Sequence, residues 1–258
     1  MSIGAGIAAG PGGRGSSALR FGVPVGLVAI AAAGWWWSAR VAGEMSGPAM
    51  GQMGEAMSFG AFVIAWVAMM AAMMLPAVVP VVKLYARAAG RGTVAPVPFF
   101  VAGYLALWTV AALPAYVAWR ELAMPLADGL PWAVTIAGIT LLLAGVWQLT
   151  PMKSVCLRHC RSPIGFFIRS KGRSNRASGA FRMGVAHGGF CLGCCWALFA
   201  VLVVAAGMSL VWLVAFTVLI VLEKTTPAGE QIALGAGVVL AGLGVGLLFE
   251  PSLITAIT

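Results

Sequence analysis

Long stretches of apolar residues, separated by short polar segments, run through the chain. A membrane crossing by an α-helix needs about 20 consecutive apolar residues, and seven stretches approach or exceed that length. They lie at 21–39, 58–82, 97–119, 131–150, 183–206, 208–223 and 231–249. The sixth is short, and only Gly207, Met208 and Ser209 separate it from the fifth, which indicates a tight turn. The pattern predicts an all-α, polytopic transmembrane bundle of about seven spans.

The composition agrees with a membrane protein and excludes a nucleic-acid-binding one. Of the 258 residues 61% are hydrophobic and 9% are charged, whereas soluble domains carry about 25% charged residues. The net charge of +9 would suggest nucleic acid in a soluble protein. Membrane proteins, however, collect Lys and Arg in their cytoplasmic loops, and the aromatic residues here lie inside the apolar stretches.

The distribution of basic residues predicts the orientation of the chain. With a cytoplasmic N-terminus, 14 of the 16 basic residues fall on the cytoplasmic side, and only Arg40 and Arg120 fall outside. The positive-inside rule therefore favours this topology. We expect a disordered cytoplasmic tail at 1–20, a single transmembrane domain at 21–250 with a cytoplasmic basic loop at 151–182, and an outer tail at 251–258.

All cysteines and histidines of the chain lie within one short region. They are Cys156, His159, Cys160, His187, Cys191, Cys194 and Cys195. At about 100° per residue, the four from His187 onwards form one stripe of a helix, and the first three share a face of another. Both helix ends border the cytoplasmic loop, so the two stripes can converge. Thiol and imidazole groups bind soft or borderline metal ions.

The pattern therefore predicts a metal site near the cytoplasmic face that reaches towards the membrane centre. The candidate ligands are Cys156, Cys160, His187, Cys191, Cys194 and Cys195. Cys191 and Cys194 are the favoured core ligands, and His159 is the weakest candidate. Cytoplasmic thiols stay reduced, so structural disulfides are not expected. The alternative is that the cysteines are small buried packing residues.

Methionines are unevenly placed along the chain. Four lie in or beside the predicted outer loop and four lie in the second apolar stretch: Met45, Met50, Met53, Met57, Met69, Met70, Met73 and Met74. Thioether is a soft ligand suited to Cu(I), so the two groups suggest a path for monovalent copper. Met also fills irregular gaps in protein cores, and packing is the alternative for the second group.

Four segments resemble the DUF2182 family of bacterial, predicted metal-binding integral membrane proteins. They are Trp66–Pro76, Lys153–Pro163, His187–Trp196 and the pair Glu223–Lys224. The resemblance covers roughly residues 60–245 and implies a multi-pass protein of the bacterial inner membrane. It implies metal-binding roles for Cys156, Cys160, His187, Cys191, Cys194 and Cys195. From the residues alone, Glu223 and Lys224 either form a functional ionisable site or simply pair with each other.

We expect a membrane protein that handles a soft metal ion, with Cu(I) favoured and Zn(II) as the alternative. Its role would be transport, or delivery to a membrane metalloenzyme, and its partners would be the bilayer and that enzyme or a metallochaperone. No phosphate-binding loop is present, so ATP-driven pumping by this chain is not expected. The alternatives are a membrane thiol oxidoreductase and a structural or assembly subunit. An enzymatic role is less favoured, and the sequence does not decide it.

Overall fold

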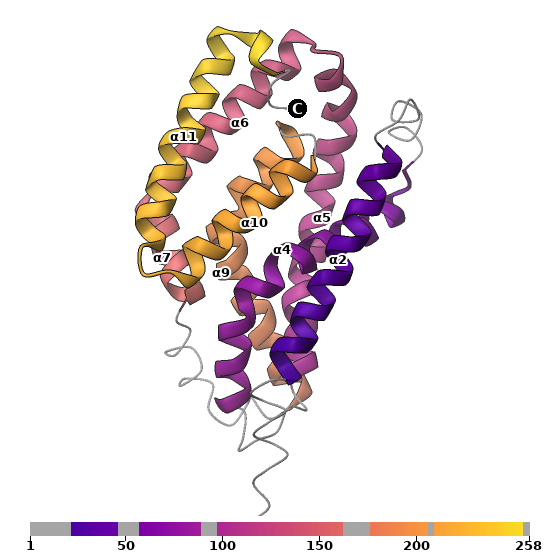
Figure 1. The fold of residues 1–258 in the computed structure, drawn as a ribbon, viewed down its shortest axis with the longest axis vertical. Coiled ribbons are helices and arrows are strands. Elements are labelled where there is room, and N and C mark those ends of the chain that lie inside the picture. Colours follow the sequence, from indigo (N-terminus) through magenta and orange to yellow (C-terminus); the bar gives the residue numbers. More distant parts are fainter. Residues whose placement is uncertain (1–21, 46–56, 89–96, 162–175, 206–208, 255–258) are drawn as a thin grey trace, which may run out of the picture.

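The computed structural model describes residues 22–45, 57–88, 97–161, 176–205 and 209–254. Within these ranges the regular structure is helical throughout (Figure 1), and no strand occurs. The helices are α2 (Val23–Met45), α4 (Phe59–Ala88), α5 (Val97–Ala127), α6 (Pro131–Leu149), α7 (Pro151–Arg161), α9 (Ala177–Val204), α10 (Leu210–Thr225), α11 (Gly229–Phe249) and the short 3-10 helix η2 (Pro251–Leu253). The all-α prediction is therefore confirmed.

Each predicted apolar stretch corresponds to one long helix. Among the described residues, α4, α5, α6, α9 and α11 are long and apolar enough to cross a membrane. These helices are consistent with a multi-pass membrane protein. The first and sixth stretches form α2 and the 16-residue α10, and their crossing of the membrane remains a prediction.

Glycines allow two helix pairs to approach closely, the antiparallel pair α6–α11 and the parallel pair α5–α9. In the pair α6–α11, a Cβ on Gly145 would lie 2.5 Å from Ala241 N, and one on Gly244 would lie 2.5 Å from Leu142 N. In the pair α5–α9, Gly184 faces the backbone of Phe100 and Tyr104. Small residues have this role at many membrane helix interfaces. The contact of Gly184 with Phe100 and Tyr104 brings α5 against the cysteine-bearing part of α9.

A break after α6 redirects the chain towards α9. Thr150 has an extended backbone, with φ −77° and ψ 148°, because a residue before proline disfavours the helical conformation. Its hydroxyl also accepts a hydrogen bond from Lys153 N at 3.3 Å. Helix α7 then packs on α9 and α10, so part of the predicted basic loop is an ordered helix that carries Cys156 and Cys160.

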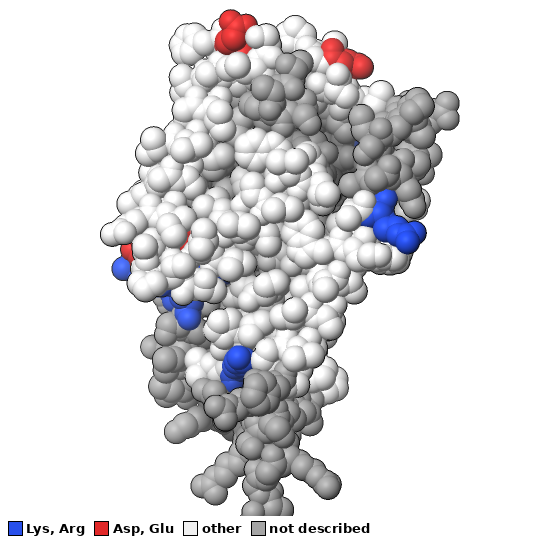
Figure 2. Space-filling model, in the orientation of Figure 1, with Lys and Arg blue, Asp and Glu red and all other residues white. Residues whose placement is uncertain are grey.

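Charged side chains are unevenly spread over the surface. On the face in Figure 2 the upper end carries carboxylates and the basic side chains lie lower, with a wide uncharged surface around them. The cytoplasmic position of the N-terminus remains a prediction. The predicted tail at 1–20, the loop methionines Met50 and Met53, and much of the basic loop at 162–175 lie outside the described residues.

Candidate metal centre

Helices α7 and α9 bring four thiols together in the interior. The residues, here called the thiol cluster, are Cys160, Cys191, Cys194 and Cys195, and each is at most 2% exposed. Cys160 lies within hydrogen-bonding range of the Cys191 and Cys194 thiols, and the sulfurs of Cys194 and Cys195 are 3.3 Å apart. The hydrogen bond to Cys191 is the largest influence that raises the pKa of Cys160. All the cysteines are free thiols.

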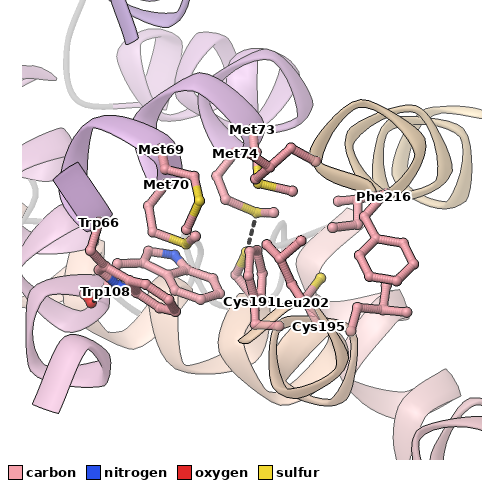
Figure 3. Close-up of a cluster of buried hydrophobic side chains, with 14 of the residues drawn as sticks. Trp66, Met69, Met70, Met73, Met74, Trp108, Cys191, Cys195, Leu202 and Phe216 are labelled. Atoms are coloured by element: carbon pink, nitrogen blue, oxygen red, sulfur yellow. Dashed lines mark hydrogen bonds between the residues drawn. The ribbon is translucent and has the colours of Figure 1, made fainter. Parts of the chain in front are cut away.

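Cys191 is the centre of this cluster because three other helices contribute contacts to its sulfur. Tyr104 on α5 places its hydroxyl 3.0 Å from Cys191 Sγ. Lys224 at the end of α10 places Nζ 2.9 Å away, and Met74 on α4 places Sδ 3.8 Å away (Figure 3). The periodicity of α9 explains the shared face, while the contacts from other helices arise from tertiary packing.

Glu223 and Lys224 do not pair with each other. Glu223 Oε2 accepts a hydrogen bond from Lys153 Nζ at 2.7 Å, and Glu223 Oε1 accepts one from Gln148 Nε2 at 3.2 Å. Lys224 instead points to sulfur, with Nζ 3.8 Å from Met74 Sδ as well as 2.9 Å from Cys191 Sγ. Among the described residues no carboxylate forms a salt bridge with Lys224. Adjacent residues therefore serve two separate polar networks.

His187 lies one turn before Cys191 on the same face of α9. It is 1% exposed, and neither ring nitrogen has a hydrogen-bond partner among the residues that the structure describes. The rings of Phe100 and Tyr104 flank it, with centroids 6.0 Å away. A buried polar group without a partner is costly, so these nitrogens are well suited to a ligand.

Two residues of the sequence-predicted region lie apart from the thiol cluster. Cys156 is partly exposed, and its sulfur packs against Gly193, where an added Cβ would lie 3.0 Å away. His159 is exposed, hydrogen-bonds with Val155 O at 2.9 Å and stacks on Phe190. The expected common face of α7 is thus split, and only Cys160 from that helix joins the cluster.

The donors fit copper by type, although they do not form a preassembled cage. Soft sulfur ligands select Cu(I). Within the part of the chain that the structure describes, however, no three His, Cys, Asp or Glu side chains are arranged to hold a metal ion. The Lys224 ammonium occupies one side of Cys191, and Cys194 Sγ donates to the Cys191 carbonyl at 3.1 Å. Metal binding at this centre therefore requires side chains to move.

Sequence reasoning missed three neighbours of Cys191. Tyr104 carries no recognisable signal, because its distance along the chain hides its contact with α9. The sequence marks Lys224 as an ionisable residue near a span end and Met74 as one member of a methionine group, but it does not predict that either contacts Cys191. Only the packing of α4, α5 and α10 around α9 shows that these side chains meet at one sulfur.

Comparison with known proteins relates the chain to a copper-related family. A family model described as PpoB2, copper chaperone, matches residues 63–247. Its range includes α9, α10 and the whole thiol cluster. The matching family is copper-related and is not DUF2182 by name. No curated protein and no solved structure matches the chain.

Proposed function

This chain belongs to the PpoB2 copper chaperone family, and we propose that it binds Cu(I) at the thiol cluster and delivers it to a membrane metalloenzyme. Copper is cargo here, bound and passed on without chemical change. The observation that carries the proposal is the gathering of four reduced, buried thiols, with Cys191 at their centre. Thiolates bind Cu(I) strongly.

The proposed ligand set follows the geometry of the cluster. The sulfur of Cys191 contacts side chains of three other helices, and this central position favours it as the main ligand. The thiols of Cys160, Cys194 and Cys195 all lie within hydrogen-bonding range of Cys191 and would complete the site. His187, with its unpartnered nitrogens, would serve copper that arrives or leaves along α9. Cys156 would act only at the margin.

We further propose that the protein is a multi-pass protein of the bacterial inner membrane with seven spans and a cytoplasmic N-terminus. The apolar helices support a bilayer location, and the basic residues support the orientation. The site would then be reached from the cytoplasmic side. A soluble copper donor could approach there, and helix contacts within the bilayer could engage the recipient enzyme.

Metal content of the purified protein tests the proposal. Detergent-purified wild type would be loaded separately with Cu(I) and Zn(II) under reducing conditions and compared with a Cys191→Ser, Cys194→Ser double variant. Cys156→Ser is the matched control, because it makes the same change outside the cluster. We expect near-stoichiometric Cu(I) in wild type and control, and its loss in the double variant.

Two outcomes would contradict the proposal. Well-folded wild type that retains no Cu(I) would refute copper binding at this site, and cycling of its thiols to disulfides would then favour the oxidoreductase alternative. Zn(II) retained in preference to Cu(I) would instead indicate a structural zinc site, for which four tetrahedral S or N ligands suffice.

A further inference from the structure

The Lys224 ammonium is a buried cation whose closest partners are sulfur atoms. Its Nζ lies 2.9 Å from Cys191 Sγ and 3.8 Å from Met74 Sδ. The two sulfurs lie 3.8 Å from each other, so the three atoms form a compact triangle. Lys224 is 7% exposed. A monovalent cation thus already lies between a cysteine sulfur and a thioether in the interior of the protein.

We propose that this position is the copper position: Cu(I) displaces the Lys224 ammonium, and Met74 joins Cys191 as a ligand. The inference rests on the proposed function and adds a ligand from a different helix. Thiolate and thioether are both donors that select Cu(I). Two sulfurs bound to one ion at about 2.3 Å with trigonal angles lie about 4 Å apart, close to the 3.8 Å between Cys191 Sγ and Met74 Sδ.

The exchange replaces one single positive charge by another. In this exchange Cys191 is a thiolate paired with the ammonium 2.9 Å away, since a neighbouring cation favours the thiolate form. No S–H bond therefore has to break: hydrogen bonds from Nζ to the sulfurs break, copper–sulfur bonds form, and neither an electron nor a proton is transferred. A buried charge without compensation is costly. Because Cu(I) carries the same single positive charge as the ammonium, it needs no counter-ion beyond those already present. Lys224 lies in the last turn of α10, and its flexible stem allows the displaced ammonium to move towards water. Return of the ammonium to Cys191 would assist release of the copper.

Met74 has a closely matched control on the same helix. Met70 lies one turn earlier, and both side chains are 0% exposed. Figure 3 shows the Met74 sulfur directed at Cys191, whereas the Met70 sulfur lies beside the Trp108 indole. Leu replaces Met in a core with little change of volume, so the variants Met74→Leu and Met70→Leu differ chiefly in which thioether is lost.

The first test is a Cu(I) competition titration against a chromophoric chelator. We expect Met74→Leu to raise the Kd for Cu(I) about tenfold, equivalent to about 1.4 kcal/mol, and Met70→Leu to bind as wild type does. Equal affinities of the two variants would overturn the ligand role of Met74 while leaving copper binding by the cluster intact. Absence of binding in wild type would instead refute the proposed function.

The second test follows Lys224 itself by mass spectrometry. A membrane-permeant amine-acylating reagent would be applied to the metal-free and the Cu(I)-loaded protein. We expect acylation of Lys224 to rise at least about fivefold on loading, because the freed ammonium moves towards water. Lys153 is the internal control, since its salt bridge with Glu223 does not involve sulfur. Unchanged protection of Lys224 in the loaded protein would overturn the displacement.

Discussion

The buried ion pair between Lys153 and Glu223 anchors the helix that carries Cys160. Lys153 Nζ lies 2.7 Å from Glu223 Oε2, and the two side chains are 1% and 0% exposed. Lys153 is two turns before Cys160 on α7, so the pair fixes α7 against the end of α10. Arg161 supports the same attachment by donating to Thr226 O. Substitution of Lys153 by Met tests how far the thiol cluster depends on this anchor.

The magnitude follows from the burial of the charge that remains. In Lys153→Met the Glu223 carboxylate keeps, among the described side chains, the Gln148 amide at 3.2 Å as its hydrogen-bond partner. Removing one partner of a buried ion pair costs about 3 to 5 kcal/mol. The exposed pair Arg158–Glu230 is the matched control, at 3.8 Å with side chains 62% and 44% exposed. Surface pairs of this kind contribute at most about 1 kcal/mol.

Two measurements on the same variants separate stability from site geometry. SDS-driven unfolding, followed by tryptophan fluorescence, gives the free energy of unfolding, and mass spectrometry of alkylated protein gives the reactivity of Cys160. We expect Lys153→Met to lose about 3 to 5 kcal/mol and to expose Cys160 to alkylation, while Arg158→Met changes neither substantially. Equal losses for the two variants, or a Cys160 as protected as in wild type, would refute the anchoring role.

Two further predictions concern helix packing and the limits of the thiol cluster. Gly184→Ala should cost about 1 to 3 kcal/mol of unfolding free energy, because its Cβ would lie 2.9 Å from the Phe100 carbonyl carbon. Gly189→Ala, which meets nothing within 4 Å, should unfold as wild type does, and equal losses in SDS titration would contradict this. Cys160→Ser should weaken Cu(I) binding about tenfold, whereas Cys156→Ser should leave it unchanged. The reverse order of affinities in a competition titration would show that Cys156, and not Cys160, is the copper ligand on α7.

The positions of the helices could be predicted because they depend on local apolar length. Each predicted stretch coincides with a helix, although the ends differ by up to eight residues: the stretch 131–150 corresponds to Pro131–Leu149, whereas 97–119 corresponds to Val97–Ala127. The helix inside the basic loop was not predicted as a separate element. Its low apolar content gives no span signal, and the Pro151 that ends α6 also begins α7.

The shared stripe of His187, Cys191, Cys194 and Cys195 could also be predicted, since helical periodicity alone places them on one face, and all four are buried. The α7 residues could not be sorted in the same way. Cys156 and Cys160 are four residues apart, so helical periodicity places both on the same face of α7. Of the two, however, only Cys160 is fully buried. That difference depends on how α7 turns against α9, which tertiary contacts determine.

The same limitation explains Lys224. From the sequence it could pair with the adjacent Glu223, the nearest opposite charge along the chain. In the structure Glu223 is paired with Lys153, which is distant in sequence. The lysine is therefore available to the sulfurs of Cys191 and Met74. The salt bridge between Lys153 on α7 and Glu223 on α10 thus leaves Lys224, and not Lys153, next to the thiol cluster.

X-ray absorption at the copper edge tests most directly whether Cu(I) is bound by sulfur at the Cys191 centre. The protein loaded with one equivalent of Cu(I) would be compared with the Cys191→Ser variant loaded identically. We expect a Cu(I) edge with a first shell of sulfur at about 2.3 Å, which is lost or largely replaced by oxygen or nitrogen in the variant. A wild-type shell dominated by oxygen or nitrogen, or a sulfur shell that survives in Cys191→Ser, would contradict it.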